Sequence, residues 1–581
     1  MAKEAQKAPE TASVALAGSG GSGVMTAGQM LLDAGAESDL YGFMTRSLGP
    51  QIRGGEAAAF VRFSPREITS VGNWFDLLVA FDWVSTERFK GEINLEERSR
   101  VLYDPANGNP PQWILDSGAK CIEFPLKAMA AEIEGGRVNM IALGACTSLL
   151  GIQEEAVLSF VEKALGKKGE AVLTASNAGI NSGYAFGEKI ASICKLERAA
   201  KGKKAASAER WNISGNEACG LGAIRGGVRF VAAYPITPAT EVLEWLAPNL
   251  EKIGGHLVQA EDELASINMA IGGSFGGVPS LTATSGPGLA LMTDSIGLSV
   301  ASETPVVIID VQRGGPSTGI PTKSEQVDLN IALYGLHGDA PHLVTATNSV
   351  ADCLFTTQWS TYLAEHTQAP VIVLTDQMLG QTRCIIDKPE RSDIVGKRKL
   401  AKPGQENYER YAVTKSGISP MAVPGIPGCE YVADGLEHNP KGIPSVQAEH
   451  HLEQLEKRER KLQSPDYTKY WADIEGEGET AIITWGSSTG PSREAMKHAE
   501  REGMKVKLIS IRLLSPVQPD LFAKAMKGVK RILIVEQSHS KQFRNYLFAH
   551  FDMPKDTKGI HQPGPLPIRP AKVFEELMNW S

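Results

Sequence analysis

The sequence lacks the grouped cysteines that bind a metal ion or an iron–sulfur cluster. Its seven cysteines are scattered over 581 residues, and no two of them form a C-x-x-C pair. Such spacing is typical of reduced, buried thiols in a cytoplasmic protein. Because clusters are held by closely spaced cysteine thiolates, we expect neither a cluster nor any other metal site on this chain.

Long apolar runs and an excess of positive charge are also missing. No run reaches 18 apolar residues, the length that a membrane-spanning helix needs. The first residues, MAKEAQKAPETAS, lack the apolar core of a secretion signal. The formal net charge of −8 argues against nucleic acid as a partner. We therefore expect a cytoplasmic protein that binds neither nucleic acid nor membranes.

The chain is too long for one domain, and residues 1–200 form the first of three α/β regions. A basic, alanine-rich segment near 196–204 ends this region and is typical of a linker. The apolar pattern predicts strands at 14–17, 77–81 and 138–144 and a helix at 153–165.

The second region, 207–385, alternates apolar runs with segments of helix length. The runs lie at 230–235, 280–285, 305–311 and 369–376. This alternation predicts a doubly wound parallel sheet with helices on both faces. Residues 386–475 form an irregular connection with one charged helix at 448–463, whose charges we expect in solvent. Residues 476–581 form a smaller α/β region.

A glycine-rich loop, Gly18-x-Gly20-Gly21-x-Gly23, follows the first strand and precedes a helix. That setting suits a phosphate group, but also a tight turn that packs helix on strand. A nicotinamide site would need an acid at the end of a second strand. Glu37 and Asp39 lie in a loop-like stretch instead. Their position disfavours a nicotinamide site.

Two turns and a loop follow the strands of the second region. YPITPAT (234–240) places Thr237 between two prolines, and TATSGPG (282–288) repeats the pattern of strand, small polar turn and helix. Ligands of doubly wound sheets bind at such strand ends. The alternative for Thr237 or Thr240 is to cap the next helix.

Arginine precedes Gly-Gly three times, at Arg53, Arg225 and Arg313. Glycine lets the backbone approach a neighbour closely, and the guanidinium fork suits a carboxylate or phosphate. For any one of the three, a surface ion pair is the ordinary alternative. Arg313 also opens RGGPSTGIPTKSEQVDL, a loop dense in Gly, Pro and hydroxyl groups, and such loops after core strands are often functional.

Three acids, Glu261, Asp262 and Glu263, precede an apolar helix rich in small residues. A helix N-terminus favours negative charge, which explains Glu261 and Asp262 without any catalytic role.

YPITPAT, EDELASINMAIGG, TSGPG and VQRGGPSTGIPTKSEQ, in this order, resemble the 2-oxoacid:ferredoxin oxidoreductases. The resemblance is greatest to the fused gamma–alpha subunit of the 2-oxoglutarate-specific members (2-oxoglutarate synthase) and covers almost the whole chain. It implies a gamma-type domain at 1–200, a pyrimidine-type thiamine diphosphate domain at 207–385 and a transketolase C-terminal-like domain at 476–581.

The resemblance also assigns residues to the cofactor. One glutamate of the family hydrogen-bonds N1′ of the aminopyrimidine and thereby activates the cofactor. Glu263 fits the spacing to Gly288 and Arg313 without a gap, whereas Glu261 fits only with a shift and is our second choice. Pro235, Ser285 and Gly286 are the further cofactor-binding candidates.

For the substrate, the resemblance places Thr237 and Arg313 at the 2-oxo-carboxylate and Thr322 at the distal end. Lys323, beside Thr322, could meet a second carboxylate, although no family motif matches it. For coenzyme A, the candidates are Gly20, Gly21, Arg53 and Gly54, because phosphate groups are bound by nearby backbone N–H groups and by positive charge.

The implied reaction is the coenzyme-A-dependent oxidative decarboxylation of 2-oxoglutarate to succinyl-CoA and CO2, with reduction of ferredoxin. The reverse reaction would fix CO2, as in a reductive TCA cycle. Pyruvate, branched-chain 2-oxo acids and indolepyruvate are the alternative substrates. The chain lacks the family's G-D-G…N segment, so a beta subunit would carry Mg2+, the diphosphate site and a [4Fe-4S] cluster in an (alpha–beta)2 assembly. An NAD-dependent oxidoreductase and a non-catalytic scaffold are the competing hypotheses.

Overall fold

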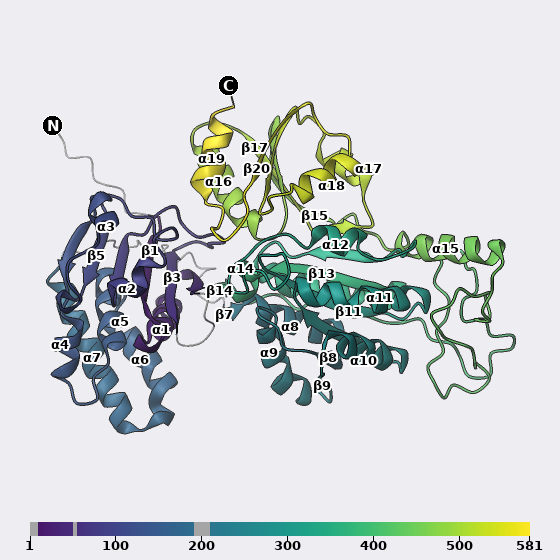
Figure 1. The fold of residues 1–581 in the computed structure, drawn as a ribbon, viewed down its shortest axis with the longest axis horizontal. Coiled ribbons are helices and arrows are strands. Elements are labelled where there is room, and N and C mark those ends of the chain that lie inside the picture. Colours follow the sequence, from purple (N-terminus) through teal and green to yellow (C-terminus); the bar gives the residue numbers. More distant parts are fainter. Residues whose placement is uncertain (1–9, 50–54, 191–208, 581) are drawn as a thin grey trace. The chain divides into compact units, whose positions relative to one another are not determined.

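The computed structural model describes residues 10–49, 55–190 and 209–580, which form two compact units (Figure 1). The first unit runs to Ser214 and includes Gln381–Glu390 and Arg569–Ala571. The second unit contains the rest. The linker predicted near 196–204 lies outside the described residues.

An eight-stranded sheet forms the first unit, in the order β6-β5-β4-β1-β3-β2-β14-β7. The four strands from β6 to β1 are parallel and the others antiparallel. Two segments that the sequence analysis counts with the second region, β7 and β14, therefore complete this sheet. The strands are β1 (Ala12–Ser19), β2 (Tyr41–Leu48), β3 (Glu56–Ser64), β4 (Leu77–Ala80), β5 (Arg100–Tyr103), β6 (Lys120–Glu123), β7 (Arg210–Ser214) and β14 (Arg383–Asp387).

The helices of this unit confirm one prediction and correct another. Residues 153–165 form a helix as predicted, but 138–144 form a helix and not a strand. The α-helices are α1 (Val24–Glu37), α2 (Trp83–Glu87), α3 (Gln112–Asp116), α4 (Leu126–Ala131), α5 (Val138–Leu149), α6 (Glu154–Leu165) and α7 (Glu170–Glu188), and the short 3-10 helices are η1 (Gly20–Ser22), η2 (Pro105–Asn107) and η3 (Gly166–Lys168).

The prediction for 138–144 failed because α5 is buried on nearly every side. A side chain at Gly144 would overlap the backbone oxygen of Ile180, and one at Gly183 would overlap that of Ile141. These glycines let α5 and α7 pack backbone against backbone. A short helix that is apolar all round shows no periodicity that would separate it from a buried strand.

The second unit contains the parallel sheet that the sequence predicts. Its order is β18-β12-β13-β11-β10-β8-β9, and every pair except β12–β18 is parallel. Its strands are β8 (Phe230–Ala233), β9 (His256–Gln259), β10 (Ser280–Thr284), β11 (Val306–Gln312), β12 (Leu343–Ala346), β13 (Pro370–Asp376) and β18 (Leu513–Ser515), and its helices are α8 (Gly215–Gly226), α9 (Thr240–Glu251), α10 (Glu263–Phe275), α11 (Gly286–Ala301), α12 (Leu329–Tyr334), α13 (Val350–Thr367) and α14 (Gln377–Gln381).

A five-stranded sheet, in the order β15-β17-β16-β19-β20, completes the second unit. The smaller α/β region predicted for 476–581 is confirmed: between β16 and β19 the chain alternates strands with helices, after a Gly/Ser turn that follows β16. The elements are β15 (Ala472–Gly476), β16 (Thr480–Thr484), η5 (Gly486–Ser488), α16 (Thr489–Arg501), β17 (Val506–Ile511), α17 (Pro519–Ala525), β19 (Arg531–Glu536), α18 (Gln542–His550), β20 (Asp556–His561) and α19 (Pro570–Met578).

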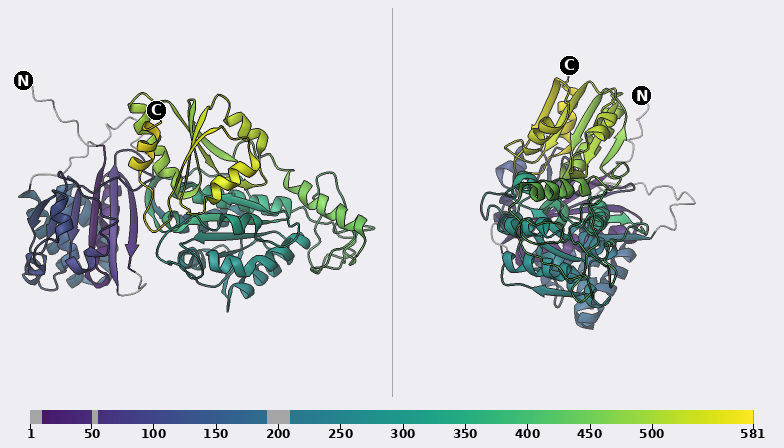
Figure 2. Two further views of the ribbon diagram at one scale, coloured as in Figure 1. Left: turned by 45° about the horizontal axis from the view of Figure 1, so that its top comes forward. Right: turned by 90° about the vertical axis from the view of Figure 1, so that its right-hand side faces the viewer.

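Between β14 and β15 the chain is irregular apart from α15 (Ala448–Leu462) and a few isolated bridges. This segment extends past one end of the seven-stranded sheet (Figures 1 and 2). The charged helix is therefore confirmed. The charges of Glu456 and Glu459 are exposed as expected, but the expectation is wrong for other charges of this helix. Lys457 and Lys461 are almost completely buried, because both pair with the fully buried Glu303, at 2.5 Å and 3.3 Å.

This cluster carries more positive than negative charge. Burial alone would raise the pKa of Glu303, but Lys457, Lys461 and Arg410 together lower it. Burial lowers the pKa of Lys457 to about 8 and that of Lys461 to about 7, against the attraction of Glu303. Glu303 is the carboxylate that offsets these buried cations.

We expect Glu303→Gln to lower the free energy of unfolding by about 3–5 kcal/mol, the usual cost of removing one partner of a buried ion pair. Urea denaturation followed by tryptophan fluorescence would measure it. Glu477→Gln is the matched control, because Glu477 pairs with Lys505 at 2.6 Å in an exposed position. Exposed pairs contribute little, so the control should unfold like the wild type. Equal behaviour of both variants would contradict the role of Glu303.

Candidate functional site

The candidate site lies at one edge of the seven-stranded sheet, where three neighbouring parallel strands end (Figure 1). The turn 234–240 follows β8, Ser285 follows β10, and Arg313 follows β11. Because the strands are parallel, their carboxyl ends meet at the same edge, which is where ligands of such sheets bind. The fold therefore brings together three segments that the sequence separates by up to 80 residues.

Glu263 is the first residue of α10, and its neighbour Asp262 caps that helix. Asp262 Oδ1 accepts a hydrogen bond from the backbone N–H of Ala265 at 2.7 Å. Glu261 and Asp262 are exposed, whereas Glu263 is only 7 % exposed. Because Asp262 caps α10, the side chain of the next residue, Glu263, points into the interior, whereas that of Glu261 does not.

Gly288, near the start of α11, leaves the space that Glu263 occupies. A Cβ atom built on Gly288 would lie 2.7 Å from Glu263 Cγ and 3.0 Å from Oε1. The structure therefore brings together the two positions whose spacing led us to choose Glu263 over Glu261. Its role at a cofactor stays a prediction.

Ser285 is the cap residue of α11, yet its hydroxyl caps nothing. Its Oγ is fully buried without a hydrogen-bond partner, and so is Oγ1 of Thr282 on β10. Buried hydroxyl groups rarely stay unpaired. Together with the buried carboxylate of Glu263, these atoms fit the polar ring of a bound aminopyrimidine. Pro235, on the turn after β8, is half-buried.

Arg313 and Thr237 meet directly. Arg313 Nη1 donates a hydrogen bond to the backbone oxygen of Thr237 at 2.6 Å, and Arg313 Nε is buried without a partner. Burial lowers the pKa of Arg313, while the nearby Asp328 opposes this shift. Arg313 is therefore a buried cation with unused hydrogen-bonding capacity, and not the surface ion pair of the alternative.

The turn that holds Thr237 is fixed by Asn216 on α8, whose Nδ2 donates to Pro238 O at 2.9 Å. The alternative role of Thr237 or Thr240 as a helix cap is wrong. Ala239 is the cap residue of α9, and no side chain caps that helix. The two prolines thus serve the shape of the turn itself, because proline fixes the backbone angle φ.

The loop after Arg313 folds back on itself through backbone hydrogen bonds. Gly314 N–H donates to Lys323 O at 2.9 Å, and Ile320 N–H donates to Gly314 O at 2.8 Å. These bonds bring the end of the loop, with the buried Thr322, back towards the residue that follows Arg313. Lys323 is half-buried. Gln326 holds the loop on the five-stranded sheet, because its Nε2 donates to Trp485 O at 2.8 Å.

Two residues of this region were missed by the sequence analysis, Asp310 and Asp328. Asp310 lies near the end of β11 and is fully buried, and neither of its carboxyl oxygens has a hydrogen-bond partner. Asp328 Oδ2 is buried without a partner as well. An aspartate inside the apolar run PVVIIDV was the signal that could have found Asp310.

The glycine-rich loop lies in the first unit and forms η1 between β1 and α1. Gly20 and Gly21 are exposed, and a Cβ atom on Gly21 would meet nothing within 4 Å. Two amides at the loop's start are already used: Ser19 N–H donates to Asp82 Oδ2 at 3.0 Å and Gly20 N–H to Gly55 O at 2.7 Å. Glu37 ends α1, so its predicted loop position is wrong.

Because of these contacts, only part of the loop is open to a phosphate group. Gly21 remains open to a ligand, but the carboxylate of Asp82 stands where a phosphate would approach Ser19. Arg53 and Gly54 lie outside the described residues. The four coenzyme A candidates therefore stay predictions.

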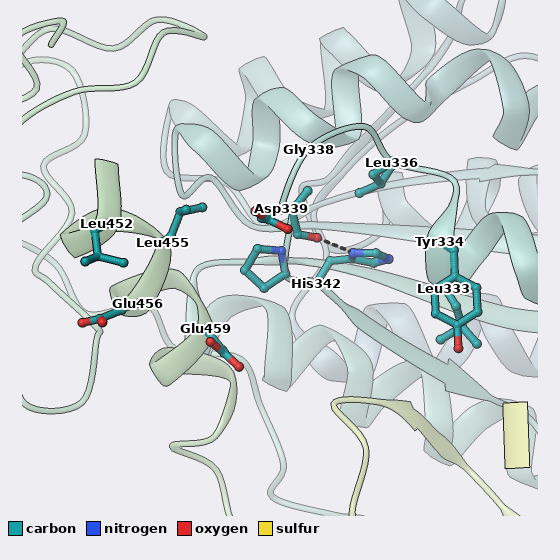
Figure 3. Close-up of a pocket in the computed structure, with 12 residues that line it drawn as sticks. Leu333, Tyr334, Leu336, Gly338, Asp339, His342, Leu452, Leu455, Glu456 and Glu459 are labelled. Carbon is teal, nitrogen blue, oxygen red and sulfur yellow. Dashed lines mark hydrogen bonds between the residues drawn. The ribbon is translucent and has the colours of Figure 1, made fainter. Parts of the chain in front are cut away.

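A cavity of about 620 Å3 lies elsewhere in the second unit, between residues 333–342 and α15 (Figure 3). Leucines line it together with three acids, Asp339, Glu456 and Glu459, and none of its lining residues is Lys or Arg. A cavity with acids and no cation does not suit a substrate with carboxylates. We therefore do not assign the chemistry to it.

Within the described ranges, no group of three or more His, Cys, Asp and Glu side chains could hold a metal ion. No helix of the described part of the chain is long and apolar enough to cross a membrane.

Three protein families match the chain. Residues 13–186 match pyruvate ferredoxin/flavodoxin oxidoreductase, and residues 221–457 match the thiamine-diphosphate-binding part of pyruvate flavodoxin/ferredoxin oxidoreductase. Residues 470–542 match the C-terminal domain of transketolase. These matches confirm the predicted fold class, and they define a multidomain α/β protein with a thiamine-diphosphate-binding domain.

Individual relatives extend over most of the chain. The alpha subunit of 2-oxoacid:ferredoxin oxidoreductase from Saccharolobus solfataricus is 29 % identical over 91 % of each chain. The KorA subunit of 2-oxoglutarate synthase from Methanothermobacter marburgensis is 35 % identical over 64 % of this chain and 99 % of that protein. The chain belongs to the 2-oxoacid:ferredoxin oxidoreductase family.

A solved structure shows the same architecture. The 2-oxoglutarate:ferredoxin oxidoreductase of Magnetococcus marinus, with 2-oxoglutarate, coenzyme A and succinyl-CoA bound, is 36 % identical and superposes with a TM-score of 0.90. The similarity covers 98 % of this chain and 99 % of that one.

Proposed function

We propose that this chain is the large subunit of a coenzyme-A-dependent 2-oxoglutarate:ferredoxin oxidoreductase, which forms succinyl-CoA and CO2 and reduces ferredoxin. The observation that carries the proposal is the joint placement of Glu263 against Gly288 and of Arg313 against Thr237 at one sheet edge. The bound ligands of the Magnetococcus marinus relative support the choice of 2-oxoglutarate and coenzyme A.

Each site residue then has a role that its surroundings allow. Thiamine diphosphate, when bound, supplies the electron sink that decarboxylation of a 2-oxo acid requires. The carboxyl group of Glu263 would hydrogen-bond N1′ of its aminopyrimidine, and Pro235, Ser285 and Gly286 would help to hold the same ring. Arg313 and the hydroxyl of Thr237 hold the 2-oxo-carboxylate, and Thr322 faces the distal end of the substrate. Burial of Glu263 and Arg313 keeps water from these contacts.

The chain supplies only part of the complete enzyme. We propose a beta subunit that carries the diphosphate and Mg2+ site and a [4Fe-4S] cluster, in an (alpha–beta)2 assembly that reduces ferredoxin. Two features support this division: the sequence has no G-D-G…N segment and no grouped cysteines. Gly20, Gly21, Arg53 and Gly54 are proposed to contact coenzyme A. We also propose a location in the cytoplasm, which is supported by the free thiols of the cysteines among the described residues.

The proposed substrate has alternatives, and the reaction has a reverse direction. Pyruvate, branched-chain 2-oxo acids and indolepyruvate would use the same contacts at the 2-oxo-carboxylate. With a strong reductant the reaction would run in reverse and fix CO2, as in a reductive TCA cycle.

The test uses the complex isolated anaerobically with this chain as bait. We expect viologen reduction that depends on both a 2-oxo acid and coenzyme A and is fastest with 2-oxoglutarate. A preference for another acid would keep the reaction and change the substrate. Reduction of NAD+ by the chain alone would favour the dehydrogenase hypothesis. A complex that contains its cluster and thiamine diphosphate but turns over no 2-oxo acid would favour the hypothesis of a non-catalytic scaffold.

A further inference from the structure

Two aspartates face each other beside the candidate site. Asp310 lies near the end of β11, and Asp328 immediately precedes α12. Gly286 makes room for Asp328, because a Cβ atom there would lie 2.7 Å from Asp328 Cγ. Apart from each other, the buried carboxyl oxygens of the pair have no hydrogen-bond partner among the described residues.

Burial and the neighbouring like charge both disfavour a second negative charge on this pair of carboxyl groups. A proton on Asp310 satisfies both groups, since Asp310 then donates a hydrogen bond to Asp328. Burial and the neighbouring Asp328 raise the pKa of Asp310 well above its usual value. Asp310 therefore stays protonated and acts as the donor.

Asp328 is the member of the pair that can change its charge. Burial raises the pKa of Asp328 to about 7, the hydrogen bond from Asp310 and the charge of Arg313 oppose that rise, and Glu325 adds to it. Among the described residues, these three are the groups that act on the pKa of Asp328. The negative charge of Asp328 near Arg313 thus appears or disappears within the neutral pH range.

We infer that Asp328 is a positioning residue that sets how strongly Arg313 holds a substrate carboxylate. When Asp328 is ionised, its charge partly offsets that of Arg313 and repels the incoming carboxylate. When Asp328 is protonated, the guanidinium charge is fully available to the substrate. This inference rests on the proposed role of Arg313 in binding the 2-oxo-carboxylate.

The test compares the wild-type complex with Asp328→Asn, which keeps the shape of the side chain and removes its charge. The KM for the 2-oxo acid should rise about tenfold between pH 6 and pH 8.5 in the wild type, a size expected for charges that interact through partly screened protein. In Asp328→Asn the KM should stay at the low value throughout. A variant with merely damaged structure would not bind substrate more tightly than the wild type at pH 8.5.

Glu325→Gln is the matched second variant, because Glu325 faces Asp328 and raises its pKa. Its removal should keep the rise in KM but move the midpoint to lower pH. This variant also decides the question if Asp328→Asn does not fold: an unchanged midpoint would overturn the inference.

Thermal unfolding of the complex supplies a readout that needs no turnover. The pKa of Asp328 is raised in the folded state. The contribution of Asp328 to folding stability is therefore complete at a pH below the ordinary pKa of an aspartate, and it is lost as the pH rises through about 7. The Tm of the wild type minus that of Asp328→Asn should therefore fall between pH 5 and pH 8.

The outcomes separate this inference from the proposed function. A wild-type complex that turns over no 2-oxo acid would overturn the proposed function and, with it, the role of Asp328 at the substrate. An active wild type whose KM depends on pH in the same way as that of Asp328→Asn would overturn this inference alone.

Discussion

Replacement of Glu263 by glutamine is expected to reduce kcat of the assembled complex by about three orders of magnitude. Positioned groups that drive proton transfer commonly contribute 10²–10⁴-fold. The glutamate is expected to hold a proton against N1′ of the aminopyrimidine, and glutamine cannot exchange that proton. Because Glu263 lies against Gly288 in a buried position, the isosteric amide should fit without any rearrangement of the fold.

The measurement is kcat for viologen reduction by complexes that bind thiamine diphosphate to the same extent. The KM for the 2-oxo acid should change little, because Glu263 is not expected to touch the substrate. Glu261→Gln is the matched control, since Glu261 is exposed two residues earlier. A loss confined to Glu261→Gln would make Glu261 the activating acid. Full activity of both variants would support the non-catalytic scaffold.

How well the sequence predicted this site depends on how local each feature is. The strands β8, β10, β11 and β13 and their polar turns follow from short apolar runs that end at Pro, Gly and hydroxyl residues. The choice of Glu263 over Glu261 needed only the family spacing. It agrees with the burial that a capping Asp262 imposes on the next residue.

Most of the features that the sequence analysis missed depend on contacts between segments that are separated in the chain. Lys457 and Lys461 belong to a charged, amphipathic helix, and nothing near them shows that Glu303 lies buried about 150 residues earlier. The pairing of β14 with β2 and β7 joins segments far apart in the chain. Asp310 and Asp328 are 18 residues apart, and only the returning loop brings their carboxyl groups together.

Arg313 carries the second prediction with a large expected effect. We expect Arg313→Met to raise the KM for the 2-oxo acid about 100-fold or more, since removal of one partner of a buried, hydrogen-bonded charge pair costs several kcal/mol. Arg313→Lys should recover only part of the loss, because an ammonium group cannot donate two parallel hydrogen bonds to a carboxylate. Arg225→Lys, at another Arg-Gly-Gly sequence, is the matched control and should behave as the wild type.

The pattern across substrates shows which carboxylate Arg313 binds. All 2-oxo acids share the carboxylate next to the oxo group, so a contact there predicts the same relative rise in KM for 2-oxoglutarate, pyruvate and branched-chain acids. A rise confined to 2-oxoglutarate would place Arg313 at the distal carboxylate and contradict the proposed arrangement. The hydrogen bond from Arg313 to the Thr237 backbone favours the first outcome, because it ties the guanidinium to the turn whose hydroxyl is expected to contact the same carboxylate.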